Sequence, residues 1–210
     1  ALTLTQASNI SVIVSIAPIF TGILAHFFLE GEKMKKSIVL GFVCAMAGIC
    51  LITFQKGETV ELNPLGDFLG VAASAIWGVY SICSRKIAGF GYDTIITTRR
   101  TFFYGILFML CALPFMDFHL SLSALLKPVN LGNIIYLGVG ASAICFVTWN
   151  YAVKSLGATR ASVYIYGIPV VTILMSIPLL HEVITFQAMA GTVLTLVGLL
   201  ISEWPFSPKK

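Results

Sequence analysis

Seven long apolar stretches constrain the fold of this chain more than any other feature. A helix that crosses a bilayer needs about 20 mostly apolar residues, and each stretch is close to that length without an Asp, Glu, Lys or Arg. Strands of a membrane β-barrel instead alternate apolar and polar residues over about 10 positions. Because these runs are continuous, we predict an all-α polytopic membrane protein with seven transmembrane helices. They cover residues 10–29, 37–54, 68–84, 101–116, 133–153, 161–180 and 183–202.

Composition excludes a water-soluble domain. Of the 210 residues, 58% are hydrophobic and only 10% are charged, whereas soluble domains carry about 25% charged residues. The five cysteines lie inside apolar stretches and form no CxxC pair, so we expect no metal site and no cofactor. His181 and Glu182 begin an HExxH sequence, but position 185 is Thr, so the zinc protease motif fails and we expect no enzyme.

The basic residues are unevenly distributed between the two sides of the predicted membrane. If the seven spans alternate in direction, eleven of the 13 Lys and Arg residues fall on one side, and only Lys56 and Lys127 fall on the other. Cytoplasmic loops are enriched in Lys and Arg. We therefore predict a multi-pass protein of the cell (inner or plasma) membrane with its C-terminus in the cytoplasm.

The first two spans are repeated in the last two. At an offset of 151 the identities include Ala7/Ala158, Ser11/Ser162 and Pro18/Pro169, and at an offset of 150 they include Glu32/Glu182, Gly41/Gly191 and Gly48/Gly198. We expect the copies to run in opposite directions, because the loop within the first helix pair carries Lys33, Lys35 and Lys36, whereas the equivalent turn at residues 181–185 has no Lys or Arg. Inverted repeats of this kind are a recurring architecture of secondary transporters.

The repeat predicts a domain organisation. Residues 1–54 would be the last two helices of a first repeat, 55–67 an external linker, 68–204 a second repeat of five helices, and 205–210 a cytoplasmic tail. A repeat needs an odd number of spans to be inverted. We therefore expect an N-terminally truncated fragment of a ten-helix inverted-repeat (5+5) protein, with three further spans before Ala1.

The repeated segments resemble the EamA-type members of the drug/metabolite transporter superfamily. The resemblance rests on the segment from Ala7 to Val12 with Pro18 and Glu32, on its second copy from Ala158, and on Trp77-Gly78 with Tyr80 in the third span. It covers nearly the whole chain and implies a ten-helix carrier of amino acids, nucleotides, sugars or drug-like metabolites. This chain departs from the pattern by lacking the first three helices.

Polar and aromatic side chains within the spans are the candidate cavity residues, because polar groups in a bilayer tend to face the bundle interior. A proline in the middle of a span also frees a carbonyl that can bind a ligand. The alternatives are a kink satisfied by neighbouring helices and, for the tryptophans, an aromatic belt at the interface. The substrate-binding candidates are Asn9, Ser11, Ser15, Trp77, Tyr80, Trp149, Asn150, Ser162, Tyr164 and Tyr166.

These observations predict a secondary transporter that moves small amphipathic metabolites, amino-acid-like or drug-like, by alternating access between the repeats. A seven-helix receptor or sensor without transport is the main alternative, and a membrane scaffold without a ligand is a third. The expected partners are the small-molecule substrate and the lipid bilayer, with no nucleic acid. A homodimer is left open.

Overall fold

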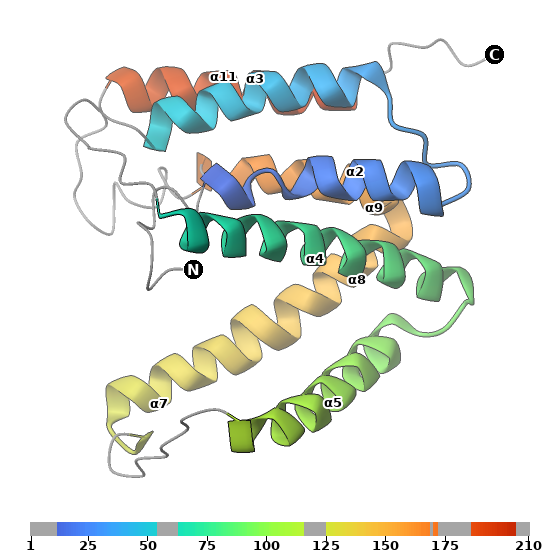
Figure 1. Ribbon diagram of the computed structural model, residues 1–210, viewed down its shortest axis with the longest axis vertical. Helices are drawn as coiled ribbons and strands as arrows, with labels where there is room; N and C mark the ends of the chain where they lie inside the picture. The colour runs from blue at the N-terminus through green and yellow to red at the C-terminus, as the bar shows by residue number, and fades with distance from the viewer. Residues whose placement is uncertain (1–11, 54–62, 116–124, 169, 172–185, 205–210) are drawn as a thin grey trace. The chain divides into compact units, whose positions relative to one another are not determined.

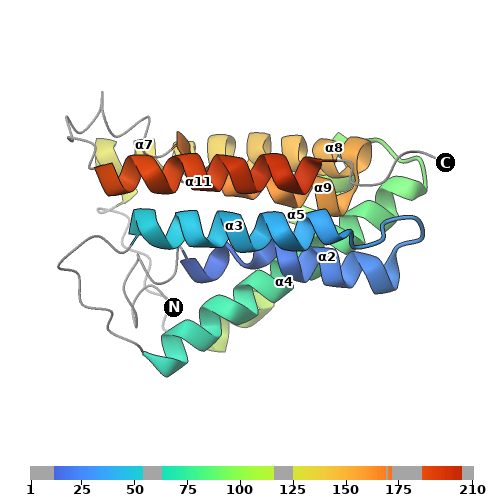
Figure 2. The ribbon, with the colours of Figure 1, turned by 90° about the horizontal axis from the view of Figure 1, so that it is seen from above.

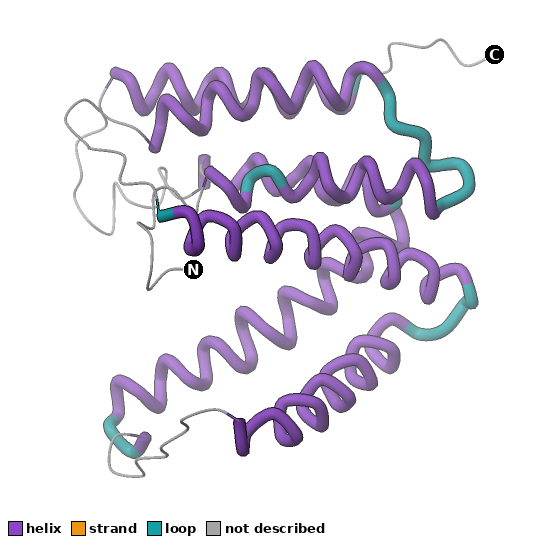
Figure 3. The backbone as a smooth tube through the Cα atoms, in the orientation of Figure 1, coloured by secondary structure: helices purple, strands orange, loops and turns teal. Residues whose placement is uncertain are grey.

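The structure is a computed structural model of the 210-residue chain. It describes residues 12–53, 63–115, 125–168, 170–171 and 186–204. Every regular element within these ranges is helical, as Figure 3 shows. The prediction of an all-α chain is therefore confirmed over the part that the structure describes.

Within the described ranges, five helices are long and apolar enough to cross a membrane, and a shorter apolar helix covers Val12–Phe28. Predicted spans two, three, four, five and seven correspond to these five helices. The first predicted span corresponds to the shorter helix. Of the sixth, only residues 161–168 and 170–171 are described. The five helices are α3 (Lys36–Thr53), α4 (Pro64–Gly89), α5 (Thr94–Ala112) with its extension to Phe115, the continuous helix Pro128–Leu156, and α11 (Phe186–Glu203).

The continuous helix has three parts, which are α7 (Pro128–Ile135), a π-helical segment (Tyr136–Ile144) and α8 (Cys145–Leu156). The shorter apolar helix includes α2 (Ala17–Phe28), and α9 (Ala158–Val163) follows α8 after a single residue, Gly157. The sequence predicted a longer connection there, at residues 154–160.

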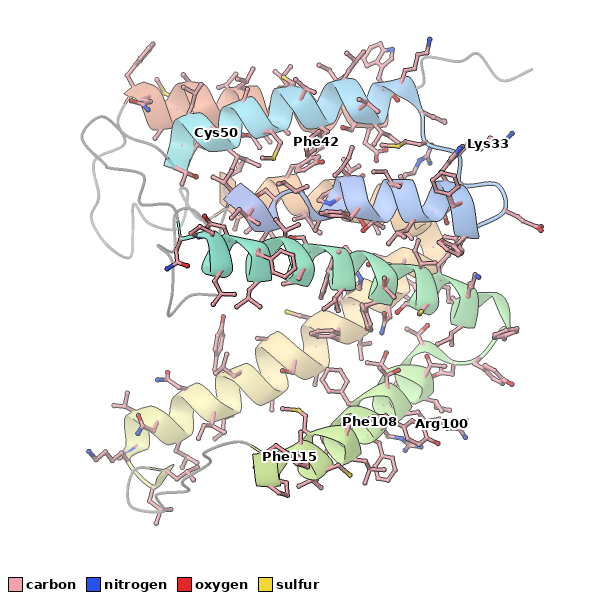
Figure 4. The ribbon with its side chains drawn as sticks, in the orientation of Figure 1. Lys33, Phe42, Cys50, Arg100, Phe108 and Phe115 are labelled. Atoms are coloured by element: carbon pink, nitrogen blue, oxygen red, sulfur yellow. The ribbon has the colours of Figure 1, made fainter. Side chains whose placement is uncertain are left out.

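Helix α5 begins seven residues before the predicted span. Asp93 precedes its first turn, and one carboxylate oxygen of Asp93 accepts hydrogen bonds from the backbone N–H groups of Ile95 (2.9 Å) and Ile96 (3.0 Å). Such a cap satisfies amide groups that a helix otherwise leaves unpaired at its start. The predicted connection 85–100 is consequently shorter, and Arg100, labelled in Figure 4, lies within the helix.

The chain divides into two compact units, Ala1–Cys83 with Leu156–Lys210 and Ser84–Ser155. In the second unit, α5 and its 3₁₀ extension (Leu113–Phe115) carry large exposed apolar side chains, such as Phe108 (77% exposed) and Phe115 (91%), both labelled in Figure 4. Contiguous apolar surface of this extent is unusual on soluble proteins and suits contact with lipid.

In the first unit, α3 and α11 pack side by side and antiparallel, as Figures 1 and 2 both show. Their contact is lined by glycines. A Cβ atom added at Gly48 would lie 2.6 Å from the carbonyl oxygen of Gly191, and one added at Gly198 would lie 2.7 Å from that of Gly41. Glycine allows helix backbones to approach this closely.

The glycine contacts are reciprocal. Helices α3 and α11 have bounds that differ by 150 residues at both ends, so Gly41 is the repeat counterpart of Gly191, and Gly48 is the counterpart of Gly198. In the structure Gly41 faces Gly198, and Gly48 faces Gly191. Gly41 thus meets the counterpart of Gly48, and Gly48 meets the counterpart of Gly41. This reciprocal contact is the pattern of a two-fold interface.

Candidate functional site

The first apolar helix is interrupted at Ser15 and Ile16, before Pro18, and Figure 3 shows the interruption as a loop. Pro18 has no N–H to donate to the carbonyl of Val14, so the regular helical pattern cannot continue there. The nearby carbonyl of Ile13 accepts a hydrogen bond from the Ile16 amide (3.1 Å). The Ser74 hydroxyl of α4 has one hydrogen to share between the Ile13 carbonyl (3.2 Å) and the Gly70 carbonyl of its own helix (3.0 Å). The break is therefore supported by a neighbouring helix.

A second interruption lies at the equivalent place in the other copy of the repeat. Helix α9 ends at Val163, and a 3₁₀ turn covers Tyr164–Tyr166, shortly before Pro169 in the sequence. The offset of 151 residues relates Ser15 to Tyr166 and Pro18 to Pro169. The departures from regular α-helix in the two predicted copies therefore include the same repeat position, Ser15 in one and Tyr166 in the other.

Tyr166 is the most enclosed side chain at the second break. It is 1% exposed and packs in a cluster with Ala45, Ile49 and Val163. Phe42 of α3, labelled in Figure 4, packs against the same cluster. Within the described residues, the Tyr166 hydroxyl has no hydrogen-bond partner. An unpaired buried hydroxyl costs about 1–3 kcal/mol, which makes this group notable.

The other candidates in this segment have different surroundings. Ser162 is fully buried, and its hydroxyl donates to the Ala158 carbonyl at 2.8 Å, as a helix-stabilised serine does. Tyr164 is half exposed, so the structure does not place it with Tyr166. Ser15 is buried at the first break. Asn9 and Ser11 lie outside the described residues.

Trp77 and Tyr80 of α4 form an aromatic pair. Their ring centroids are 5.6 Å apart, and both side chains are partly buried. The adjacent Gly78 brings α4 close to α2, because a Cβ atom there would lie 3.2 Å from the Thr21 amide nitrogen. The pair therefore lies on a helix that packs directly against the interrupted one.

Asn150 belongs to the second unit and lies in a polar cluster. Its side-chain amide donates to the Thr98 hydroxyl at 2.9 Å, and that hydroxyl donates to the Thr94 carbonyl at 2.7 Å. Thr98 is 3% exposed. A cavity of about 20 Å³, large enough for water, adjoins the cluster. It is lined by Ser84, Ile87, Ala88, Tyr92, Thr94, Thr97, Thr101 and Asn150.

The hydroxyls of α5 present acceptor atoms to this cavity. Thr101 donates its hydrogen to the Thr97 carbonyl, and Thr97 donates to the carbonyls of Asp93 or Thr94, each at 3.0 Å. Lone pairs on these oxygens remain available to a group that donates hydrogen bonds. Trp149, the neighbour of Asn150 on α8, is partly buried.

Thr98 and the hydroxyl face of α5 were not among the sequence candidates. A signal for them exists, because Thr94, Thr97, Thr98 and Thr101 are spaced by three or four residues and therefore share one side of a helix. It was missed because Thr94 to Thr98 fall before the apolar run that defined the predicted span.

Together the long apolar helices define a multi-pass helical membrane protein. The chain belongs to the EamA-like transporter family, whose model matches residues 1–54 and 64–204. The family resemblance in the sequence is thereby confirmed.

Curated relatives support this assignment. The chain is 28% identical over 203 residues to the uncharacterized transporter YyaM of Bacillus subtilis, covering 95% of this chain and 65% of the relative. It is 31% identical over 192 residues to an uncharacterized transporter of Archaeoglobus fulgidus, covering 91% and 66%. It is 27% identical over 195 residues to a protein of Streptantibioticus cattleyicolor named a "probable terminal-alkyne amino-acid exporter", covering 93% and 63%. The chain thus spans about two thirds of the length of these relatives.

The fold also matches a solved protein crystal structure, with a TM-score of 0.79 at 20% sequence identity. The match covers 96% of this chain and 69% of that one. At this level of identity the match shows a shared fold.

Proposed function

We propose that this chain is the larger part of a secondary transporter that moves amphipathic metabolites, amino-acid-like or drug-like, by alternating access between two inverted repeats. Residues 1–54 supply the last two helices of the first repeat, and residues 68–204 supply the five helices of the second. The observation that carries the proposal is the pair of departures from regular α-helix at Ser15–Ile16 and Tyr164–Tyr166, which overlap at the equivalent repeat positions 15 and 166. In membrane transporters, interrupted helices of this kind form ligand sites. The full protein would have ten helices.

The α3–α11 pair supports the inversion. Inverted repeats place equivalent helices in opposite directions about an axis in the membrane plane. Helices α3 and α11 are equivalent in sequence, run antiparallel, and meet through reciprocal glycine contacts. A glycine-lined contact of this kind suits a fixed axis about which the remaining helices rearrange. The excess of basic residues on one side supports a C-terminus on the cytoplasmic side of a cell membrane.

The side chains near the breaks suit an amphipathic solute. Binding sites for small molecules combine apolar and aromatic walls with a few polar groups that fix orientation. Trp77 and Tyr80 would supply aromatic surface, and Ser15 with the Tyr166 hydroxyl would supply polar contacts. The amino-acid exporter among the relatives supports an amino-acid-like solute. Asn9, Ser11, Ser162, Tyr164, Trp149 and Asn150 remain cavity predictions.

Transport by the full-length protein in proteoliposomes tests this proposal. A panel of labelled amino acids and amphipathic drugs would be offered, and the apparent KM would be measured for each solute that accumulates. Tyr166→Phe removes only the buried hydroxyl and should raise the KM about tenfold, the equivalent of one lost hydrogen bond to the solute. Tyr104→Phe makes the same change at an exposed tyrosine of α5 that is not a cavity candidate, and it should leave the KM unchanged.

Two results would contradict the proposal. Equal KM values for the two phenylalanine variants would show that the Tyr166 hydroxyl does not bind the solute. A folded protein that binds solutes but moves none across the bilayer would support the receptor alternative.

A further inference from the structure

The carboxylate of Glu32, four residues beyond the end of α2, holds the start of α9. One oxygen accepts a hydrogen bond from the Ala158 amide at 3.2 Å. The other accepts from the Thr159 amide at 3.0 Å and from the Thr159 hydroxyl at 3.2 Å. Hydrogen bonds to an ionised group are roughly twice as strong as those between neutral groups. The contact is therefore one of the stronger polar links among the described helices.

The backbone at this point is shaped to receive the carboxylate. Gly157 has φ +94° and ψ +158°, a conformation that is open essentially only to glycine. A Cβ atom at Gly157 would lie 2.7 Å from the nearer Glu32 oxygen. Ala158 is fully buried and Thr159 is 6% exposed, so solvent does not readily replace the contact.

This contact joins the two predicted repeats at one end of the helices. Glu32 follows a helix of the first repeat, whereas Gly157, Ala158 and Thr159 belong to the second. The methyl group of Thr159 also lies 3.8 Å from where a Cβ atom of Gly22 would be, so α2 and α9 pack together there. Lys33 and Arg160 flank the contact in sequence, which places it on the basic, predicted cytoplasmic side.

We propose that Glu32 is a latch that closes the cytoplasmic side of the transporter by holding α2 against the start of α9. This inference rests on the proposed alternating-access function. The cytoplasm-open state requires the two repeats to part at this end, and parting breaks the three hydrogen bonds that Glu32 accepts from Ala158 and Thr159. The structure shows the latch closed. Glu32 thereby sets the fraction of molecules that open to the cytoplasm.

Thiol accessibility in inside-out vesicles tests the latch. In the full-length protein with its native cysteines replaced by serine, Ala25→Cys places a reporter on α2. Ala25 is fully buried and lies one turn beyond Gly22. A membrane-impermeant maleimide should label this thiol about tenfold faster after Glu32→Ala, given the charged hydrogen bonds lost. Glu30→Ala is the matched control, because Glu30 is an exposed carboxylate two residues away.

Milder variants keep the test decisive if Glu32→Ala does not fold. Glu32→Gln retains an acceptor oxygen, and Thr159→Val removes only the hydroxyl donor, so each should raise the labelling rate two- to fivefold, consistent with one weakened bond. Labelling of the folded Glu32 variants at the Glu30→Ala rate would overturn the latch.

The latch and the transport proposal fail separately. If no solute crosses the membrane but Glu32 variants still label faster, the latch stands as a conformational contact and the transport proposal falls. If solutes are transported but the Glu32 variants do not label faster, the transport proposal stands and the latch is overturned.

Discussion

Replacing Gly48 by alanine puts a methyl group where α3 and α11 already touch. The added carbon would lie 2.6 Å from the Gly191 carbonyl oxygen and equally near the Thr195 amide nitrogen. These two are backbone atoms, which cannot rotate away as a flexible side chain can, and the Thr195 hydroxyl oxygen also contacts the added carbon. Ordinary contact begins near 3.4 Å, so the two helices must separate locally by about 0.8 Å, or one must bend.

The cost follows from that separation. A gap of about 0.5–1 Å forfeits a quarter to a half of the dispersion energy between the atoms concerned, and overpacking typically costs about 1–3 kcal/mol. Alanine recovers roughly 0.5–1 kcal/mol, because glycine is unfavourable inside a helix. We therefore expect Gly48→Ala to lower the free energy of unfolding by about 0.5–2 kcal/mol, the difference of these two terms.

Unfolding of the full-length protein in mixed micelles, followed by circular dichroism as denaturing detergent is added, measures this change. Gly105→Ala on α5 is the matched control, because within the described residues nothing lies within 4 Å of its added carbon. That variant should be neutral or slightly stabilising. The Gly48→Ala and Gly191→Ala changes should be less than additive, because separating the helices once relieves both overlaps.

The reasoning would be refuted if Gly48→Ala destabilised the protein no more than Gly105→Ala does. Strict additivity of the Gly48 and Gly191 variants would show that the two glycines do not share one contact.

Three further substitutions test the local structure through the same unfolding measurement. Asp93→Ala should cost about 1 kcal/mol by removing the α5 cap, while Asp93→Asn, which keeps an acceptor oxygen, should cost less. Thr98→Val leaves an N–H of Asn150 without its acceptor and should cost about 1–3 kcal/mol; little loss would indicate that water replaces the threonine. Gly157→Ala should cost about 1–3 kcal/mol from its backbone conformation, partly relieved when Glu32→Ala is added, whereas a neutral effect would contradict the described turn.

The helices were predictable where apolar length alone decides them. The second predicted span, 37–54, differs by one residue at each end from α3, because its apolar run and its helix end together. The start of α5 was not predicted, since the apolar run begins at Thr101 while the helix begins at the Asp93 cap. A polar first turn outside the hydrocarbon region leaves no hydropathy signal, and only the capping residue reveals it.

The candidate site was predictable in part for a similar reason. The prolines and the repeat indicated where the helices break, because proline lacks a donor at any depth. The contact of Asn150 with Thr98, and that of Glu32 with Thr159, join residues 52 and 127 positions apart. Such pairs depend on which helix ends meet in space, and a single sequence does not contain that information.

The reciprocal α3–α11 contact affects which amino-acid substitutions the two helices can accept. In an assembly of two identical chains, a substitution in such a face would occur twice, once on each side. In this single chain it occurs once, so equivalent positions can differ. Gly191 has Ile52 against it, whereas Gly41 has Ser202, the counterpart of Ile52, in the same place. One side of the contact can therefore be apolar, and the other can contain a hydrogen-bonding side chain, without any change at the glycines themselves.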